Sequence, residues 1–282
     1  MVALKSNGIT LEVERRGDPL GPPVLLIRGL GSQLIHWPEQ MIAALMTAGF
    51  HVVTFDNRDS GLSQKCGDRA PYSLRDIADD AVGLMDALGI ARAHVLGLSM
   101  GGMILQLIAL HHPDRLSSAT IVMSSSQSPR LPQADPEIQE MMRATALSPQ
   151  RADVIAHELW TGRGFQSPRW PFDDTKRAAL IGPAFDRCYC PQGTARQYAA
   201  VTGASEHLAD IEAIRTPTLV IHGTEDRLLP PAHGRNIAAR IPGAELIEID
   251  GMGHDLEGDL PLLIAQHFEA HIKKSAAWIP RP

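Results

Sequence analysis

Short apolar runs recur along the chain and predict the strands of a sheet. The first such segment, residues 9–13, alternates apolar and polar positions, which is typical of an antiparallel edge strand. The later runs are short, continuous and mostly apolar, as are strands buried on both faces of a parallel sheet. They cover residues 24–27, 51–55, 93–96, 120–123, 218–221 and 245–249.

Helical patterns separate most of these runs. Residues 73–88 carry the clearest one, because Ser73 can cap a helix whose apolar positions fall on one face. Those positions are Ile77, Ala81, Leu84, Met85 and Leu88. Residues 103–111 and 260–272 also predict helices. The alternation of strands and helices indicates a mostly parallel sheet that helices cover on both faces.

The alternation stops between residues 128 and 210. This stretch has no strand pattern, contains scattered prolines, and includes a helical segment over residues 136–145. We interpret residues 128–210 as a helical cap that packs over the sheet. Residues 1–127 and 211–282 then form the core domain.

Large apolar side chains in the cap suggest an apolar pocket for the substrate. We expect Trp160, Phe165 and Phe185 to take part in substrate binding. Each of them can instead belong to the internal core of the cap, and for any single aromatic residue this second role is the more common one.

Length, composition and charge suit one soluble α/β domain, or a core with a modest insertion. The chain has 282 residues, of which 44% are hydrophobic and 21% are charged. Its formal net charge of −6 argues against nucleic acid as a partner, because phosphate binding needs concentrated positive charge.

The cysteines and the apolar runs bear on the compartment. Cys66, Cys188 and Cys190 do not make a disulfide framework, and no second Cys/His cluster accompanies the last two, so zinc is not expected. Residues 1–16 lack a signal-peptide pattern, and the longest apolar runs are far too short to span a bilayer. We expect a cytoplasmic protein with free thiols and no membrane partner.

The strongest chemical signal is the segment 97–101, Gly-Leu-Ser-Met-Gly, which matches the G-x-S-x-G pattern. A predicted strand ends just before it, and a helix begins near Gly101. In this context the serine sits on a sharp, strained turn that projects its hydroxyl from the sheet, and the flanking residues must be glycine because side chains would clash. The sequence therefore predicts that Ser99 is a nucleophile.

A serine hydroxyl needs a base, and the base needs an orienting acid. In strand–turn–helix hydrolases these follow the serine in the order acid, then histidine. Asp226 lies in the loop after the strand at 218–221, and His254 ends a glycine-rich loop after the strand at 245–249. We expect these two residues to complete the catalytic set with Ser99.

Other acids and histidines fit these roles less well. Glu225 is one residue from Asp226, so its side chain turns away, and Asp250 lies too near His254 and is interpreted as a turn acid. His222 lies at a strand end and His233 at a helix start, and neither follows the last strand in a glycine-rich loop.

Acyl transfer also needs donors for the oxyanion. One is expected from the backbone N–H of Met100, directly after the serine. The second is expected from the loop at residues 27–32, where Gly29 and Gly31 give the backbone freedom to turn the N–H of Leu30 inward. Such a reaction needs no metal and no organic cofactor.

Four segments carry a resemblance to a known family. Residues 56–63 resemble the D-x-R-G-x-G-x-S loop of the α/β-hydrolase superfamily, and residues 96–102 hold the serine turn. With residues 108–117 and 249–254, they make the chain most similar to aclacinomycin methylesterases and the small bacterial carboxylesterases related to them. The resemblance extends over the core but not over the cap.

This resemblance implies an α/β fold: a mostly parallel eight-stranded α/β-hydrolase sheet with helices on both faces and a helical cap insertion. It also implies hydrolysis of small esters. It assigns the catalytic roles to Ser99, Asp226 and His254, and the oxyanion hole to Leu30 and Met100. In residues 56–63, Asp56 and Arg58 are expected to tie down loops beside the site.

Two positions depart from the family pattern. Arg28 stands where many relatives have histidine, and it can either hold a substrate carboxylate or pair with a buried acid and stiffen the loop. We favour the buried pair. Asp59 stands where the family usually has glycine.

The expected function is hydrolysis of a small-molecule carboxylic ester through an acyl-enzyme. A serine nucleophile argues against dehalogenase and epoxide hydrolase chemistry, which uses a carboxylate at this turn. C–C bond hydrolysis, lactone opening and perhydrolysis use the same three side chains, and a slow-turnover ligand receptor on this fold is a further alternative.

Overall fold

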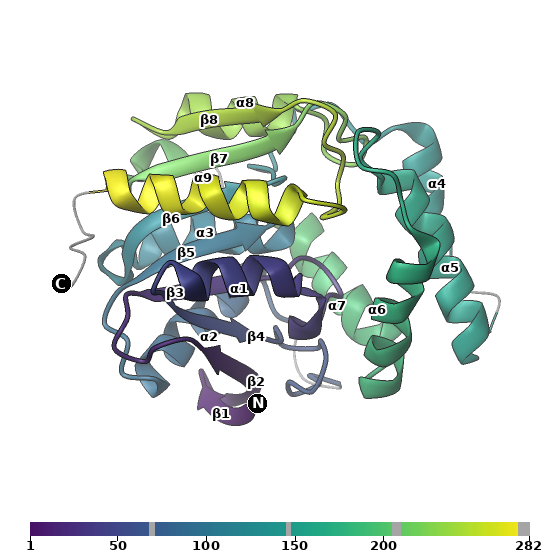
Figure 1. The fold of residues 1–282 in the computed structure, drawn as a ribbon, viewed down its shortest axis with the longest axis horizontal. Coiled ribbons are helices and arrows are strands. Elements are labelled where there is room, and N and C mark those ends of the chain that lie inside the picture. Colours follow the sequence, from purple (N-terminus) through teal and green to yellow (C-terminus); the bar gives the residue numbers. More distant parts are fainter. Residues whose placement is uncertain (68–70, 145–147, 205–209, 276–282) are drawn as a thin grey trace.

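One eight-stranded sheet forms the centre of the protein in the computed structural model, which describes residues 1–67, 71–144, 148–204 and 210–275 (Figure 1). The strand order across the sheet is β1-β2-β4-β3-β5-β6-β7-β8. β2 pairs antiparallel with β1 and β4, and all other neighbours are parallel. The strands are β1 (Val2–Ser6), β2 (Ile9–Arg16), β3 (Pro23–Ile27), β4 (His51–Phe55), β5 (Ala93–Leu98), β6 (Leu116–Val122), β7 (Thr218–Gly223) and β8 (Glu245–Ile249).

Helices cover both faces of the sheet, as predicted. On one face lie α1 (Glu39–Thr47) and α9 (Leu260–Lys274), which contact each other (Figure 1). The other face carries α2 (Leu74–Ala87), α3 (Met100–His111) and α8 (Ala232–Arg240). Short 3-10 helices span η1 (Leu34–His36), η2 (Pro113–Arg115) and η3 (Ile211–Ala213).

The apolar runs of the central strands result from this double cover. In β3, Val24 and Leu26 join the core under α1 and α9, whereas Leu25 and Ile27 join the core under α2 and α3. Successive side chains point to opposite faces of a sheet, so a strand with two buried faces has apolar residues at every position.

Local signals mark several boundaries correctly. Ser73 is the N-cap of α2, where its hydroxyl accepts from the N–H of Asp76 and the Asp76 carboxylate accepts from the N–H of Ser73 at 2.8 Å. The prediction that Ser73 caps this helix is confirmed. α3 begins at Met100, one residue before the start near Gly101 expected from the serine motif and three residues before the helical pattern at 103–111, because it starts directly at the serine turn.

The structure differs from the predicted strands at two places. β1 was not predicted, because its mostly exposed residues do not alternate clearly between apolar and polar. Asn7 and Gly8 connect it to β2 with φ values of 45° and 76°, and Asn-Gly at such positions is a strong hairpin signal. β6 begins at Leu116, four residues before the predicted run, because the polar but buried Ser118 hydrogen-bonds to His94 of the neighbouring strand.

In the described residues between β6 and β7, four α-helices follow one another. They are α4 (Pro136–Arg143), α5 (Arg151–Phe165), α6 (Asp174–Arg187) and α7 (Pro191–Thr202), and we call them the insertion. Figure 1 shows α4, α5 and α6 standing at one end of the sheet, with α7 nearer to the strands. Thr145, the end of the predicted 136–145 helix, lies outside the described residues.

The loop after β4 is tied to several elements by polar contacts. The Asp56 carboxylate accepts from the N–H groups of Leu34 at 2.6 Å and Leu62 at 2.8 Å, and it pairs with Arg187 of α6 at 2.6 Å. Arg58 donates two hydrogen bonds to Asp80 of α2, at 2.6 and 2.7 Å. The expectation that Asp56 and Arg58 hold loops in place is confirmed.

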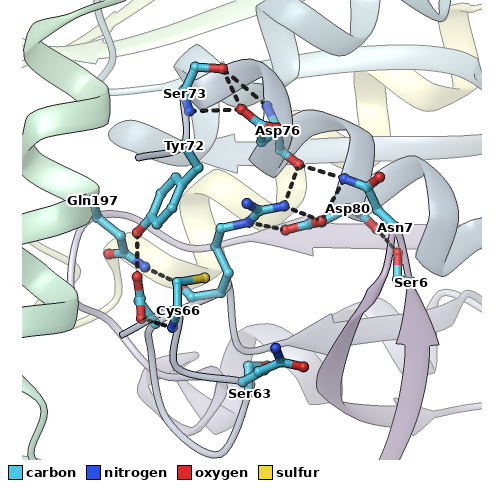
Figure 2. A network of polar contacts seen from close by, with 12 residues as sticks. Ser6, Asn7, Ser63, Cys66, Tyr72, Ser73, Asp76, Asp80 and Gln197 are labelled. Carbon is cyan, nitrogen blue, oxygen red and sulfur yellow. Dashed lines mark hydrogen bonds and ion pairs between the residues drawn. The ribbon is translucent and has the colours of Figure 1, made fainter. Parts of the chain in front are cut away.

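A wider network surrounds the Arg58–Asp80 pair. Figure 2 shows Ser6 and Asn7 meeting Asp80 from the β1–β2 hairpin, and Gln197 approaching from α7. The Ser6 hydroxyl donates to the Asp80 carbonyl at 2.6 Å, and the Asn7 amide donates to its carboxylate at 3.0 Å. The network therefore connects the edge hairpin, the loop after β4 and the insertion.

Asp59 has the backbone conformation that explains the glycine of related sequences. Its φ is 68°, in the left-handed region where glycine is favoured. The buried carboxylate accepts from the N–H of Cys66, the hydroxyl of Tyr72 and the guanidinium of Arg196 on α7. Burial alone would raise the pKa of Asp59, but these donors outweigh it and hold the pKa below its usual value. Asp59 thus adopts a backbone conformation that is less favourable for it than for glycine, and its side chain links this loop to the insertion.

Candidate active site

Ser99 occupies the strained turn between β5 and α3. Its φ of 56° and ψ of −117° lie outside the regions that non-glycine residues normally adopt. The two glycines of the motif are required by space: a Cβ on Gly97 would lie 2.2 Å from the carbonyl oxygen of Gly101, and a Cβ on Gly101 would lie 2.1 Å from that of Ile27. The turn can therefore form only with glycine on both sides.

We expect Gly101→Ala to lower the free energy of unfolding by about 1–3 kcal/mol, because the new Cβ would meet backbone that cannot give way. Denaturant unfolding followed by circular dichroism measures the loss. Gly203→Ala is the control, because its Cβ would have no neighbour closer than 3.5 Å, and we expect a change of at most about 0.5 kcal/mol. Equal losses in the two variants would contradict this explanation.

Ser99, His254 and Asp226 form one chain of hydrogen bonds. His254 Nε2 lies 3.0 Å from Ser99 Oγ, and His254 Nδ1 lies 2.7 Å from Asp226 Oδ2. A carboxylate can only accept, so Nδ1 carries the proton and Nε2 is left to accept from the serine hydroxyl. This is the geometry in which a histidine can act as a general base toward a serine.

Asp226 is held as a buried, ionised acid. Its other oxygen, Oδ1, accepts from the N–H groups of Leu228 and Leu229, at 3.0 and 2.8 Å. Burial alone would raise its pKa, but His254 and these backbone donors outweigh it and keep the pKa below the usual value. The carboxylate is therefore ionised at neutral pH and available to His254.

The end of α5 and the segment that follows it fix the loop that carries His254. The carbonyl of Phe165 accepts from the N–H of His254 at 2.8 Å. The Ser167 hydroxyl accepts from the N–H of Gly253 at 2.8 Å and donates to the carboxylate of Asp255 at 2.5 Å. A Cβ on Gly253 would lie within 2.6 Å of the Phe165 carbonyl, so glycine is needed for this approach.

The loop after β3 lies beside the serine. A Cβ on Gly29 would be 3.2 Å from Ser99 Cβ, which shows how closely this backbone packs on the turn. Leu30 and Met100 both line the cavity described below. Among the described residues the N–H of Leu30 has no hydrogen-bond acceptor, whereas that of Gly31 donates to the side chain of Gln197 at 2.8 Å. The Leu30 amide is thus free to bind a ligand oxygen.

The competing residues occupy other positions. Glu225 is exposed, and the acid at His254 Nδ1 is Asp226. His222 bonds through Nε2 to the carbonyl of Leu229 at 2.7 Å, and His233 contacts Ser125 and the carbonyl of Pro132. Burial lowers the pKa of both histidines, so they remain neutral structural groups.

A cavity of 1090 Å³ lies between the insertion and the carboxyl ends of the strands. Ser99 and His254 line it, together with side chains from α4, α5, α6 and α7. Phe165 also lines it and meets the His254 ring edge-on, with ring centroids 6.3 Å apart. The cavity is large enough for a small organic substrate beside the serine.

Two of the aromatic residues proposed for substrate binding are not brought to this cavity. Trp160 is 41% exposed on α5, and its ring contacts His157 of the same helix. Phe185 of α6 packs against Tyr189, with centroids 5.1 Å apart. Neither residue lines the cavity, and the amino-acid sequence alone does not reveal which face of each helix turns toward it.

Arg28 differs from the interpretation that we favoured. Its side chain has no acidic partner among the described residues, and buried Nε and Nη1 have no hydrogen-bond partner. It instead stacks over the ring of Trp37 at 4.9 Å and lines the cavity. The buried ion pair that was expected to stiffen this loop is therefore absent from the described structure.

Gln197 and Ser167 were missed by reasoning from the sequence. Gln197 accepts from Gly31 and donates to the carbonyl of Arg58 at 2.7 Å and the hydroxyl of Ser60 at 2.9 Å. Neither residue lies in a recognisable motif, and both act on segments far away along the chain. No signal in the sequence marks them, because their burial is known only from the structure.

Within the described ranges, no group of three or more histidine, cysteine or acidic side chains is arranged to hold a metal ion. Over the same part of the chain, no helix combines the length and the apolar character that crossing a bilayer requires.

Comparison with known proteins agrees with this architecture. The model of the alpha/beta hydrolase fold family matches residues 22–256. Rhodomycin D methylesterase DnrP of Streptomyces peucetius is 28% identical, over 95% of each chain. Among solved structures, the enol-lactonase from Burkholderia xenovorans LB400 is 26% identical with a TM-score of 0.78, over 97% of this chain and 100% of that one.

A more distant structure shares the fold alone. The meta-cleavage product hydrolase CumD from Pseudomonas fluorescens IP01 has a TM-score of 0.80 at 20% identity, over 97% of this chain and 98% of that one. Because the family model matches most of the sequence, this chain belongs to the alpha/beta hydrolase fold family.

Proposed function

We propose that this protein hydrolyses small carboxylic esters through an acyl-enzyme on Ser99. The observation that carries the proposal is the hydrogen-bonded chain from Ser99 through His254 to buried Asp226, at the edge of a cavity. One relative is named as a methylesterase and one similar structure as an enol-lactonase, and both names concern an acyl carbon–oxygen bond, which favours ester chemistry over C–C cleavage.

The reaction follows from the geometry. Ser99 Oγ attacks the ester carbonyl while His254 Nε2 takes its proton, and Asp226 stabilises the imidazolium that forms. The N–H groups of Leu30 and Met100 are proposed to bind the oxyanion. His254 then protonates the leaving alcohol, and a water molecule, activated by the same histidine, releases the acid and restores Ser99. In this proposal residues 128–210 act as the cap over a core of residues 1–127 and 211–282.

Burst kinetics on 4-nitrophenyl esters of increasing acyl length test this function. We expect a burst of 4-nitrophenol near one equivalent, and an added acyl mass on the peptide that contains Ser99. Steady turnover should follow. Acylation at another residue, or no turnover of any ester, would exclude the proposal. One slow equivalent without turnover would favour a ligand receptor.

Gln197 is expected to support the oxyanion loop. We expect Gln197→Leu to lower kcat on these esters by on the order of tenfold, less than the loss from deleting an oxyanion donor, because Gly31 loses its acceptor and the Leu30 amide loses its fixed direction. Gln192→Leu, exposed on the same helix, is the control and should leave kcat within about twofold. An unchanged kcat in a folded Gln197→Leu protein would show that the loop does not depend on this side chain.

A further inference from the structure

Arg28 is a cation without a counter-ion at the edge of the active-site cavity. No ion pair or hydrogen bond to its side chain is present in the described part of the chain, and Nε and Nη1 are both buried. The side chain also lines the cavity, so a ligand can reach it from there. A buried charge without a partner is costly, and proteins rarely keep one that serves no purpose.

The charged group that acts on Arg28 is another cation, so the positive charge of Arg28 is not neutralised. Burial and the nearby guanidinium of Arg177 lower the pKa of Arg28 to about 9, and no carboxylate contributes to its environment. Arg177 has its own acid, Glu257, at 2.8 Å. At neutral pH Arg28 therefore stays charged while its local charge remains unbalanced.

Four acids line the cavity: Glu158, Asp173, Asp255 and Glu257. Asp255 accepts from the N–H and the hydroxyl of Ser167, and Glu257 pairs with Arg177. Glu158 is one of the two that remain. It lines the cavity from α5, but the charges that act on its carboxyl are those of His157 and Arg177, not that of Arg28. Asp173 lies beside Lys176 at 3.5 Å. The structure thus offers no acid of its own to Arg28.

We propose that Arg28 binds a carboxylate of the substrate, so that the preferred esters carry a negative charge in addition to the scissile ester. This inference rests on the proposed function and specifies its substrate class. A guanidinium suits a carboxylate because it donates several hydrogen bonds in one plane. The stacking on Trp37 holds the guanidinium in place without using its hydrogen-bond donors.

The position of Arg28 also limits the distance between the two groups of the substrate. Arg28 precedes Gly29, whose backbone packs on Ser99, and Leu30 offers its amide one residue later. The carboxylate would therefore lie on the β3 side of the reacting carbonyl, separated from it by a short chain. Monoesters of short dicarboxylic acids meet this requirement.

Two esters of equal acyl length test the inference: 4-nitrophenyl hydrogen adipate and 4-nitrophenyl hexanoate, which differ by a carboxylate in place of a methyl group. We expect the wild type to have the higher kcat/KM on the charged ester. Arg28→Met should lower the ratio of the two kcat/KM values by on the order of 30-fold, as for the loss of hydrogen bonds to a charged group. Arg28→Lys should retain part of the preference.

Arg169→Met is the matched control, because Arg169 also stacks on a tryptophan ring, Trp170 at 5.3 Å, but does not line the cavity. It makes the same change in net charge, and the ratio should stay within about twofold of the wild type. An equal fall of the ratio in Arg169→Met, or a folded Arg28→Met protein with an unchanged ratio, would overturn the inference.

Binding of adipate to Ser99→Ala separates this inference from the proposed function. We expect calorimetry to detect adipate binding that is lost in Ser99→Ala/Arg28→Met. Adipate binding that depends on Arg28, without turnover of either ester by the wild type, would reject the esterase and keep the anion site. Turnover of both esters with no preference for the charged one, and no adipate binding, would keep the esterase and reject the anion site.

Discussion

Replacing Ser99 by alanine is expected to lower kcat on 4-nitrophenyl esters by roughly a million-fold, to the residual rate that the oxyanion donors and substrate binding support without a nucleophile. The variant lacks the oxygen that forms the acyl-enzyme, and no other hydroxyl lies at the position held 3.0 Å from His254 Nε2 in the described structure. The loss should appear in kcat, measured with excess enzyme over long incubations, and not as a change in KM alone.

Combining Ser99→Ala with a substitution of His254 tests whether the two residues act together in one mechanism. If Ser99 and His254 act as one unit, then Ser99→Ala/His254→Ala should be no slower than either single variant. Ser117→Ala, near the amino-terminal end of β6, is a control for the general effect of losing a serine. Multiplying losses in the double variant would show that the two residues act independently and would reject the acyl-enzyme mechanism.

Asp226→Asn should lower kcat by about 10³–10⁴-fold with little change in the fold. An asparagine amide donates toward His254 Nδ1, so the imidazole moves its proton to Nε2, where it can no longer accept from Ser99. In the present structure the carboxylate at 2.7 Å imposes the opposite tautomer. Steady-state kinetics together with the thermal midpoint measure the effect.

Two neighbouring acids serve as controls for this prediction. Glu225 is adjacent in the sequence but exposed, and Asp250 is exposed at the end of β8. Glu225→Gln and Asp250→Asn should each leave kcat within about twofold. A large loss in either control, with activity retained in Asp226→Asn, would mean that another acid orients the histidine.

The central features of the site were predictable because each depends on a local requirement. The serine turn needs glycine at position 97 because a Cβ there would meet the carbonyl of Gly101, only four residues away, and glycine at position 101 because the neighbouring strand β3 passes close to the turn. The loops with Asp226 and His254 follow parallel strands, whose carboxyl ends meet at one edge of the sheet. Burial on both faces likewise makes a central strand such as β3 recognisable from its apolar run.

Two kinds of feature were not predictable in this way: which face of a helix turns toward the cavity, and which residues far apart in the sequence come into contact. Trp160 and Phe185 belong to helices whose orientation is decided by packing against other helices, so aromatic character did not place them at the cavity. Arg28 could equally have found a buried acid, and which charges surround it depends on α6 and the loop after β8.

The sequence by itself determined the strand–helix alternation, the serine turn and the order of the candidate catalytic residues, because hydrophobic periodicity and steric limits act over a few residues. Only the tertiary structure decided that Gln197 holds the loop of Leu30, that Ser167 clamps the loop of His254, and that Arg28 remains unpaired. These contacts join residues 86 or more positions apart, and their formation depends on how the insertion packs on the sheet.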